Sequence, residues 1–365
     1  MAEWVGVKKL AVVPTFDTQV DGPAPAGWSD LIMSRVLYDP DPVSGVDRSL
    51  RGYIAALSYG RATLEAKMFP PAFSDGPSVM EAAYRSLPSG HGHPYVLCVI
   101  PYSDNLHRKG FFRTVGENGV TAVARVAVWD ASVGQQRQTT GVWAMEVLHA
   151  IAGFPYLYLA KGPQMVGFDN MMYCEGMHSC AHLKQAAGWL TGRDISTQVA
   201  TSGDHILHSI GLGAPPQGRV AAVRVRTPGN TYLIEARLRS DVYERGFGRL
   251  IGGGMEFRGL GGEGVIVYET QADLQETYLM TPSALASGQS YRHPSGAFSV
   301  QVTGQVEGGM RVRVSVKPDS RCDGIRAQIR NIEEMMREET DLEILKGLRE
   351  ERARLRAQAT RLGCP

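Results

Sequence analysis

Gly141-Val-Trp-Ala-Met-Glu-Val-Leu-His-Ala-Ile-Ala-Gly-Phe-Pro155 is the stretch that best indicates how this chain folds. Its nearly unbroken apolar character predicts a buried helix, which the Gly and Pro at its end would terminate. Two reactive side chains interrupt the apolar run, Glu146 and His149. Residues three apart share a helical face, so we expect these two side chains to lie side by side.

Glu146 and His149 match two of the three defined positions of a metal-binding motif. In His-Glu-x-x-His, two imidazoles at positions i and i+4 bind zinc and the Glu acts as general base. Here the first position is Met145. A thioether binds Zn²⁺ poorly and prefers softer ions such as Cu(I). Whether the protein is an enzyme therefore depends on this position.

Composition limits the class of protein. A chain of 365 residues with 43% hydrophobic residues can form two or three packed units. Its 38 Lys and Arg nearly cancel its 37 Asp and Glu, which argues against nucleic acid and against anionic membrane surfaces as partners. The longest apolar runs, such as 95–101, fall short of the ~20 residues that cross a bilayer, so we expect no membrane insertion.

The pattern changes twice along the chain. Alternating strands and helices up to the 141–155 helix and beyond predict a mixed α/β domain over residues 1–195. Short alternating strands between Gly-rich turns then predict an all-β sandwich over 196–318. A helical tail follows over 319–365. The expected fold class is α+β.

The tail has two apolar stripes at helical spacing, one over 325–336 and one over 345–362. Thr340 and Glu343 form a capping box between them, which predicts the start of a second helix. The two helices are therefore expected to form an antiparallel hairpin, which would bring Cys322 and Cys364 together at its open end. Its leucine seam is a candidate docking surface for a protein partner. The oligomeric state stays open.

The five cysteines allow two interpretations. Cys174 and Cys180 bracket a short loop, so this pair and the Cys322 and Cys364 pair favour disulfides and an oxidising compartment. Free thiols are the alternative. The N-terminus has no secretory signal pattern, so we expect either an internal protein or one whose signal was removed.

Several separate segments, in order, resemble one family. They are a helix and strand with a Ser-Tyr-Gly-Arg turn (50–64), the helix at 141–149, an Asp-Asn-Met-Met-Tyr turn (169–173), a following helix (184–190) and two later strands (232–237 and 264–268). Together they are similar to the immune inhibitor A type of secreted zinc metallopeptidases and their gametolysin-like relatives. The resemblance implies a zincin-like α/β domain followed by a β-domain, and the terminal hairpin lies outside it.

The resemblance also identifies what is missing. The family's first zinc ligand aligns with Met145, and a further ligand expected beyond the second histidine would fall in 154–158, which contains neither carboxylate nor imidazole. Asp169, His178 or His182 could replace the missing ligands. The cluster of Cys174, His178, Cys180 and His182 could itself bind metal, but its spacing matches no common zinc motif, which favours a disulfide or loop packing.

Two functions follow. The first is a metallopeptidase-like pseudopeptidase without a cofactor that works as a binding or assembly module. The alternative is an active zinc endopeptidase with an unconventional ligand set, in which His149 binds Zn²⁺ and Glu146 is the general base. A His-to-Met change engineered into an active parent would explain Met145 but not the missing third ligand. The resemblance and the cysteine pairs suggest an extracellular protein. Otherwise it is cytoplasmic or part of a larger assembly.

Overall fold

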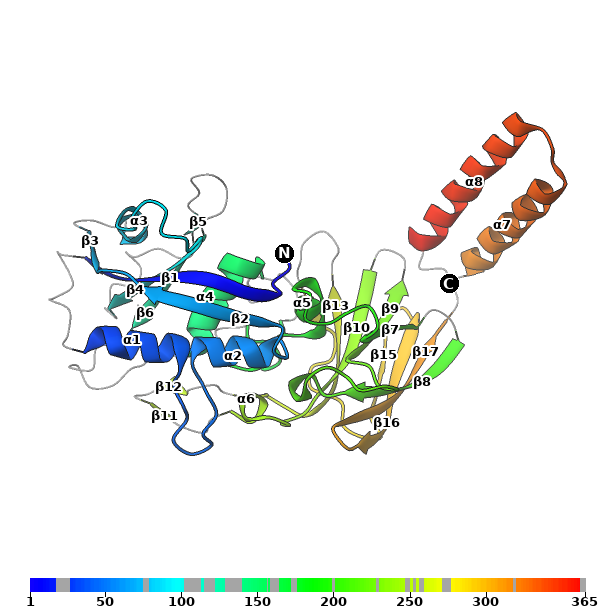
Figure 1. Cartoon of the computed structure of the whole chain (residues 1–365). Coiled ribbons are helices and arrows are strands. Elements are labelled where there is room, and N and C mark those ends of the chain that lie inside the picture. Colours follow the sequence, from blue (N-terminus) through cyan, green and yellow to red (C-terminus); the bar gives the residue numbers. More distant parts are fainter. Residues whose placement is uncertain are drawn as a thin grey trace. The chain divides into compact units, whose positions relative to one another are not determined.

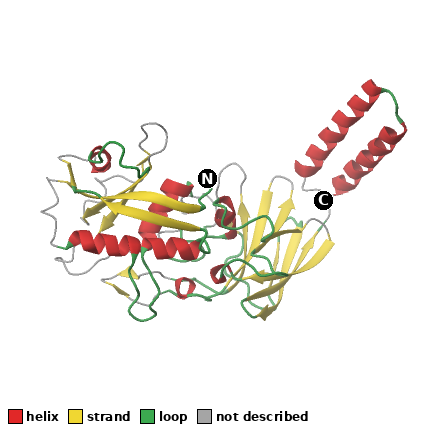
Figure 2. Ribbon diagram, viewed as in Figure 1, coloured by secondary structure: helices red, strands yellow, loops and turns green. Residues whose placement is uncertain are grey.

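The structure is a computed structural model of the whole chain (Figure 1). It describes all residues except 18–26, 75–78, 102–112, 115–121, 129–139, 156, 158–163, 172–175, 199–200, 228–229, 247–249, 252–253, 256–258, 271–276, 318–319 and 362–365. The chain is mixed α+β, with helices, strands and loops coloured separately in Figure 2.

Two compact units divide the chain. The first comprises Met1–Gly192, Ser209–Ala214 and Arg237–Glu263, and the second comprises Arg193–His208, Pro215–Ala236 and Gly264–Pro365. The first change of unit, after Gly192, lies close to the boundary expected at 195. The segments 209–214 and 237–263 belong to the first unit, whereas their sequence pattern placed them in the β-domain.

A mostly parallel sheet organises the first unit. Its strand order is β2-β1-β4-β6-β5, with β3 pairing the end of β1. Strands β1, β2, β4 and β6 run parallel, and the short β5 is antiparallel to β6. Their bounds are β1 Gly6–Asp17, β2 Ala62–Met68, β3 Ala72–Ser74, β4 Tyr95–Pro101, β5 Arg113–Thr114 and β6 Ala122–Val128. The consecutive buried residues 10–13 of β1 are typical of a strand covered on both faces.

Helices provide that cover. On one face α3 (Val79–Arg85) contributes Ala83 to a cluster with Ala11, Val13 and Cys98. Helices α1 (Trp28–Leu37) and α2 (Leu50–Leu57) pack against β2, and α4 (Thr140–Ala152) packs against α2, β4 and β6. Ser49 caps α2 by accepting a hydrogen bond from the Gly52 backbone N–H. The buried helix expected at 141–155 is therefore present as α4.

The second unit contains two sheets. One has the order β14-β13-β10-β9-β7 and the other β15-β16-β17-β8. The bounds are β7 Ile195–Gln198, β8 Thr201–His208, β9 Ala222–Thr227, β10 Asn230–Arg237, β13 Gly264–Thr270, β14 Thr277–Leu279, β15 Ser290–Arg292, β16 Phe298–Val306 and β17 Gly309–Val316. In the second sheet β16 and β17 bury alternate residues, which leaves the other side chains polar and exposed.

Helices α7 (Ser320–Glu338) and α8 (Leu342–Arg361) form the C-terminal hairpin. Ile325, Ile332 and Leu355 are buried in their seam. Glu333 on α7 contacts both Arg352 and Arg356 on α8, so the helices are aligned side by side. The side chain of Asp341, not Thr340, caps α8 by accepting the Glu343 and Ile344 backbone N–H groups. No helix in the described part of the chain is long and apolar enough to cross a membrane.

Candidate functional site

Met145, Glu146 and His149 are all buried on α4. Gly153 adopts a left-handed conformation that ends the helix, and the turn brings the Phe154 carbonyl to the His149 ring. His149 Nδ1 bonds to that carbonyl. Because a carbonyl only accepts, His149 has its proton on Nδ1. Burial is the main reason the pKa of His149 falls to about 4, and the hydrogen bond opposes this only in part.

Asp169 lies fully buried at the start of the Asp-Asn-Met-Met-Tyr sequence. Its Oδ1 accepts the Met171 backbone N–H at 2.8 Å and its Oδ2 accepts the Cys180 backbone N–H at 2.7 Å. Burial raises the pKa of Asp169 to about 6 despite these bonds. The Leu157 N–H donates to the Met171 carbonyl at 3.4 Å, which ties this loop to the segment after α4. Asp169 therefore organises its own loop.

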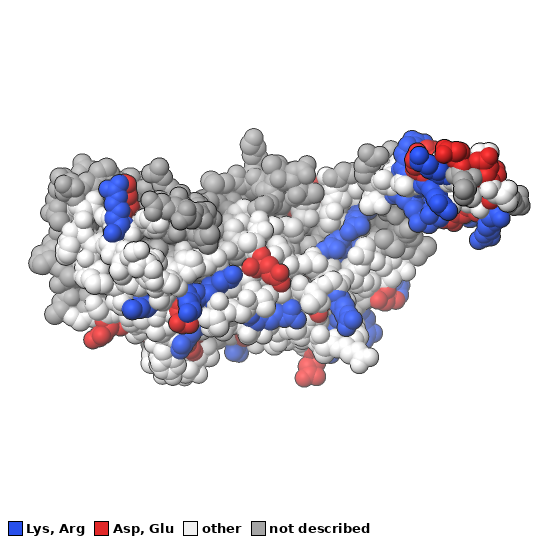
Figure 3. All heavy atoms as spheres, turned by 45° about the horizontal axis from the view of Figure 1, so that its top comes forward, with Lys and Arg blue, Asp and Glu red and all other residues white. Residues whose placement is uncertain are grey.

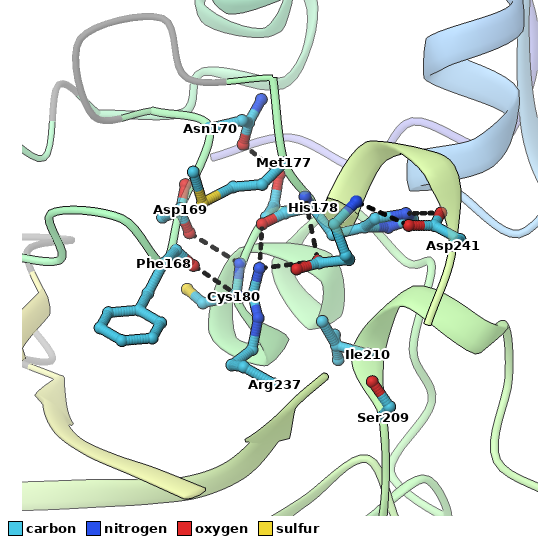
Figure 4. Close-up of polar contacts among 12 residues, drawn as sticks. Phe168, Asp169, Asn170, Met177, His178, Cys180, Ser209, Ile210, Arg237 and Asp241 are labelled. Atoms are coloured by element: carbon cyan, nitrogen blue, oxygen red, sulfur yellow. Dashed lines mark hydrogen bonds and ion pairs between the residues drawn. The ribbon is translucent and has the colours of Figure 1, made fainter. Parts of the chain in front are cut away.

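His178 lies in a buried polar network on another part of the first unit (Figure 4). Its Nε2 is 2.8 Å from Asp241 Oδ2, and its Nδ1 is 3.0 Å from Lys184 Nζ. A carboxylate accepts and an ammonium donates, so Nε2 holds the ring proton. Burial lowers the pKa of His178 to about 4, with Lys184 adding to the shift and Asp241 opposing it.

Lys184 connects this network to α2. It is fully buried on α5 (Ala181–Ala186), and its ammonium donates to the Leu57 carbonyl at the end of α2. A cation at a helix C-terminus is favoured by the helix dipole. The same ammonium lies 4.2 Å from the centre of the Tyr59 ring. Tyr59 has a positive φ of 57°, and it brings the Ser-Tyr-Gly-Arg turn into contact with this buried cation.

Arg237 is the second buried cation, at the end of β10. It donates to the carbonyls of Phe168 at 2.6 Å and His178 at 2.9 Å, and to Glu244 Oε1 at 2.8 Å. Glu244 is on α6 (Val242–Arg245). The side chain of Asp241 caps this helix by accepting the backbone N–H of Glu244. Burial raises the pKa of Glu244 to about 7, and Arg237 offsets this in part. Figure 4 shows Arg237 reaching both the 168 and 178 carbonyls.

Two of the three residues predicted as replacement ligands, Asp169 and His178, have other partners. Asp169 binds backbone amides, His178 binds Asp241 and Lys184, and His182 is half-buried on α5. Among the described residues no three His, Cys, Asp or Glu side chains are grouped so as to hold a metal ion. The fit to a three-ligand zinc site is therefore poor for the residues described.

Each of the two predicted cysteine pairs has one member, Cys180 or Cys322, among the described residues. Cys180 is buried, and its pairing with Cys174 stays a prediction. Cys174 and Cys364 lie outside the described residues. The Cys322 and Cys364 bridge stays a prediction, with Cys322 buried at the start of α7.

Sequence reasoning missed Lys184, Arg237, Asp241 and Glu244 as site residues. One signal was present: Asp241 and Glu244 have capping-box spacing, and Asp241 does cap α6. Nothing local distinguishes Arg237 or Lys184 from exposed basic residues. Their burial comes from contacts more than 50 residues apart in sequence, such as Arg237 with Phe168 and Lys184 with Leu57.

Comparison with known proteins adds no family assignment. The sequence matches no protein-family model, and no curated protein is significantly similar to it.

The histidine environments predict distinct NMR signatures. In ¹⁵N-labelled protein His149 should be the Nδ1–H tautomer and His178 the Nε2–H tautomer, and both should be largely neutral at pH 5. The unfolded chain binds these protons near pH 6.5, so each histidine reduces stability as pH falls from about 6.5 to about 4. Substitution of each by Gln assigns its signals. Protonation at pH 5, or the opposite tautomers, would contradict the geometry.

The buried ion pair predicts a large loss of stability on truncation. Arg237→Met removes the guanidinium from two buried carbonyls and leaves the buried Glu244 carboxylate without its paired cation, so urea unfolding should show a loss of about 3–5 kcal/mol. Arg85→Met, at an exposed pair with Glu81 in the same unit, should cost less than about 1 kcal/mol. Equal effects of the two variants would show that the Arg237 contacts carry no special weight.

Proposed function

We propose that this protein is a metallopeptidase-like pseudopeptidase that works as a non-hydrolytic binding and assembly module. Met145 supports the proposal, because it is buried on α4 at the position where the family that the sequence resembles has its first zinc ligand. A hydrolytic zinc site needs three protein ligands and an open position. The helix offers one imidazole, His149, and a thioether suited to softer metals.

The observation that best supports the proposal is that His178 and Asp169, two of the candidate replacement ligands, already have hydrogen-bond partners. Both ring nitrogens of His178 have partners, Asp241 and Lys184, and both carboxylate oxygens of Asp169 accept backbone amides. Recruiting either to a metal would break buried hydrogen bonds, each costing about 1–3 kcal/mol. These contacts give both residues a structural role that needs no metal.

The zincin-like and sandwich arrangements are part of this proposal. Support for the first comes from a mostly parallel sheet with an antiparallel edge strand β5 and from α4 packed on β4 and β6. Support for the second comes from the two mainly antiparallel sheets of the second unit. The loop at Asp169–Met171, joined to Leu157, is consistent with the methionine turn of the family that the sequence resembles.

The second candidate is an active zinc endopeptidase, and one observation favours it. The bond from His149 Nδ1 to the Phe154 carbonyl is the arrangement by which metal-binding histidines are oriented, since it keeps the proton off Nε2. Glu146 lies one turn away as a possible base. Under this candidate the remaining ligands come from residues that the structure does not bring together on α4.

Assembly is proposed to use the tip of the C-terminal hairpin. Met335 is 47% exposed and Ile344 is 50% exposed, and each lies within one turn of the connection between α7 and α8. Elsewhere the hairpin surface is densely charged with both signs, as Figure 3 shows at its upper right. A two-helix hairpin buries little apolar surface alone, so pairing with the hairpin of a second copy would cover the exposed tip.

Metal analysis tests the main proposal. Protein purified without added zinc should contain well under one equivalent of zinc and should not cleave casein. Met145→His should raise zinc affinity about tenfold or more by adding an imidazole one turn from His149, without producing hydrolysis. Circular dichroism checks that the variant folds. Stoichiometric zinc, with chelator-sensitive cleavage that Glu146→Ala abolishes, would instead establish the endopeptidase.

Sedimentation equilibrium tests assembly. The full chain should self-associate, and the double variant Met335→Lys, Ile344→Lys should weaken association at least about tenfold because two apolar side chains lose their burial. Gln328→Lys, Ala357→Lys adds the same charge at exposed sites away from the tip and should leave association unchanged. A wild-type protein that stays monomeric would refute assembly through the hairpin.

A further inference from the structure

A hollow of about 560 Å³ lies beside strand β8 in the second unit. Its walls come from β8 (Asp204, His205, Ile206), from the 218–220 segment, from Thr303 of β16, and from Arg311 and Arg313 of β17. This volume is within the range of ligand-binding sites in proteins. The hollow does not involve α4 or the buried network of the first unit, so its function is a separate question.

Strand β8 is an edge of its sheet, and its outer edge can accept another strand. The Ile206 carbonyl accepts the Val220 N–H at 3.1 Å, and the His208 N–H donates to the Val220 carbonyl at 2.7 Å. Even-numbered residues of β8 therefore point their backbone groups away from β17, since the direction repeats every two residues. The backbone N–H and C=O groups of Ser202 and Asp204 also point away from β17, and no described strand pairs with these outward groups.

The charged side chains of this sheet indicate what kind of peptide strand could bind at its edge. The four strands of this sheet contribute three arginines, Arg292, Arg311 and Arg313, and one carboxylate, Asp204. Arg313 binds both oxygens of Asp204, at 2.9 and 3.1 Å. Arg311 is exposed and forms no ion pair with any carboxylate in the described part of the chain. The hollow therefore offers one guanidinium in excess of its carboxylate.

We propose that β8 binds an extended acidic peptide, which adds to the sheet along Ser202–Asp204 and places a carboxylate on Arg311. Main-chain hydrogen bonds to the strand edge supply affinity, and side chains reaching neighbouring groups supply specificity. Val220 already makes such main-chain contacts further along the same edge, so the peptide continues an existing pairing. The guanidinium matches a carboxylate through two parallel hydrogen bonds.

Fluorescence anisotropy with a labelled hexapeptide alternating Thr and Glu tests this in the full-length protein. The peptide should bind, and its Thr/Gln counterpart should bind at least about tenfold more weakly. Arg311→Glu should reduce affinity about tenfold or more by placing like charges together. Ser202→Pro removes an outward N–H from the edge without breaking a ladder bond, and it should also weaken binding.

Arg292→Glu is the matched control, because it makes the same charge reversal on β15 at the opposite edge of the sheet. It should change affinity less than about twofold. Equal losses for Arg292→Glu and Arg311→Glu would reduce the effect to net charge and overturn the proposal. Sulfate competition combined with unchanged binding to Ser202→Pro would identify a small-anion site instead. Absence of peptide binding with an Arg311-dependent dimer would identify a second copy as the occupant.

Discussion

The first unit depends on a buried ammonium group. Lys184 is fully buried, and its ammonium contacts the Leu57 carbonyl, the Nδ1 of His178 and the ring of Tyr59. Burying a charge is costly unless it is paired and hydrogen-bonded. The requirement to satisfy this one cation links the end of α2, the turn that follows it and the loop leading into α5.

The need for hydrogen-bond partners extends from His178 to the segment after β10. Its Nε2 proton needs an acceptor, and Asp241 supplies it while also capping α6. Glu244 on α6 then pairs with the fully buried Arg237, which returns to the carbonyls on either side of the Asp169 loop. Pairs of this kind add little net stability compared with apolar packing, but removing one member is costly. Such a network therefore selects one arrangement of loops.

This network explains why histidine and aspartate outside α4 give little information about catalysis. His178 and Asp169 have strongly shifted pKa values, a feature that often indicates an active site. Here the shifts arise from complete burial, and both groups have structural partners. On α4 the lowered pKa of His149 also comes from burial. The chemistry of that helix therefore depends on the side chain at position 145, which is Met145.

Local sequence patterns predicted the elements with strong periodicity: the apolar strand β4, the buried helix α4, the Gly-separated strands β13 and β17, and the two helices of the terminal hairpin. The sequence also predicted that Met145 stands where the family that it resembles has an imidazole. Contacts between distant residues place residues 237–263 with the first unit and bring together Lys184, His178, Asp241 and Arg237, and local patterns did not predict either result. The reason is physical, because hydrophobic periodicity is a property of neighbouring residues, whereas the partner of a buried charge is fixed by packing between distant ones.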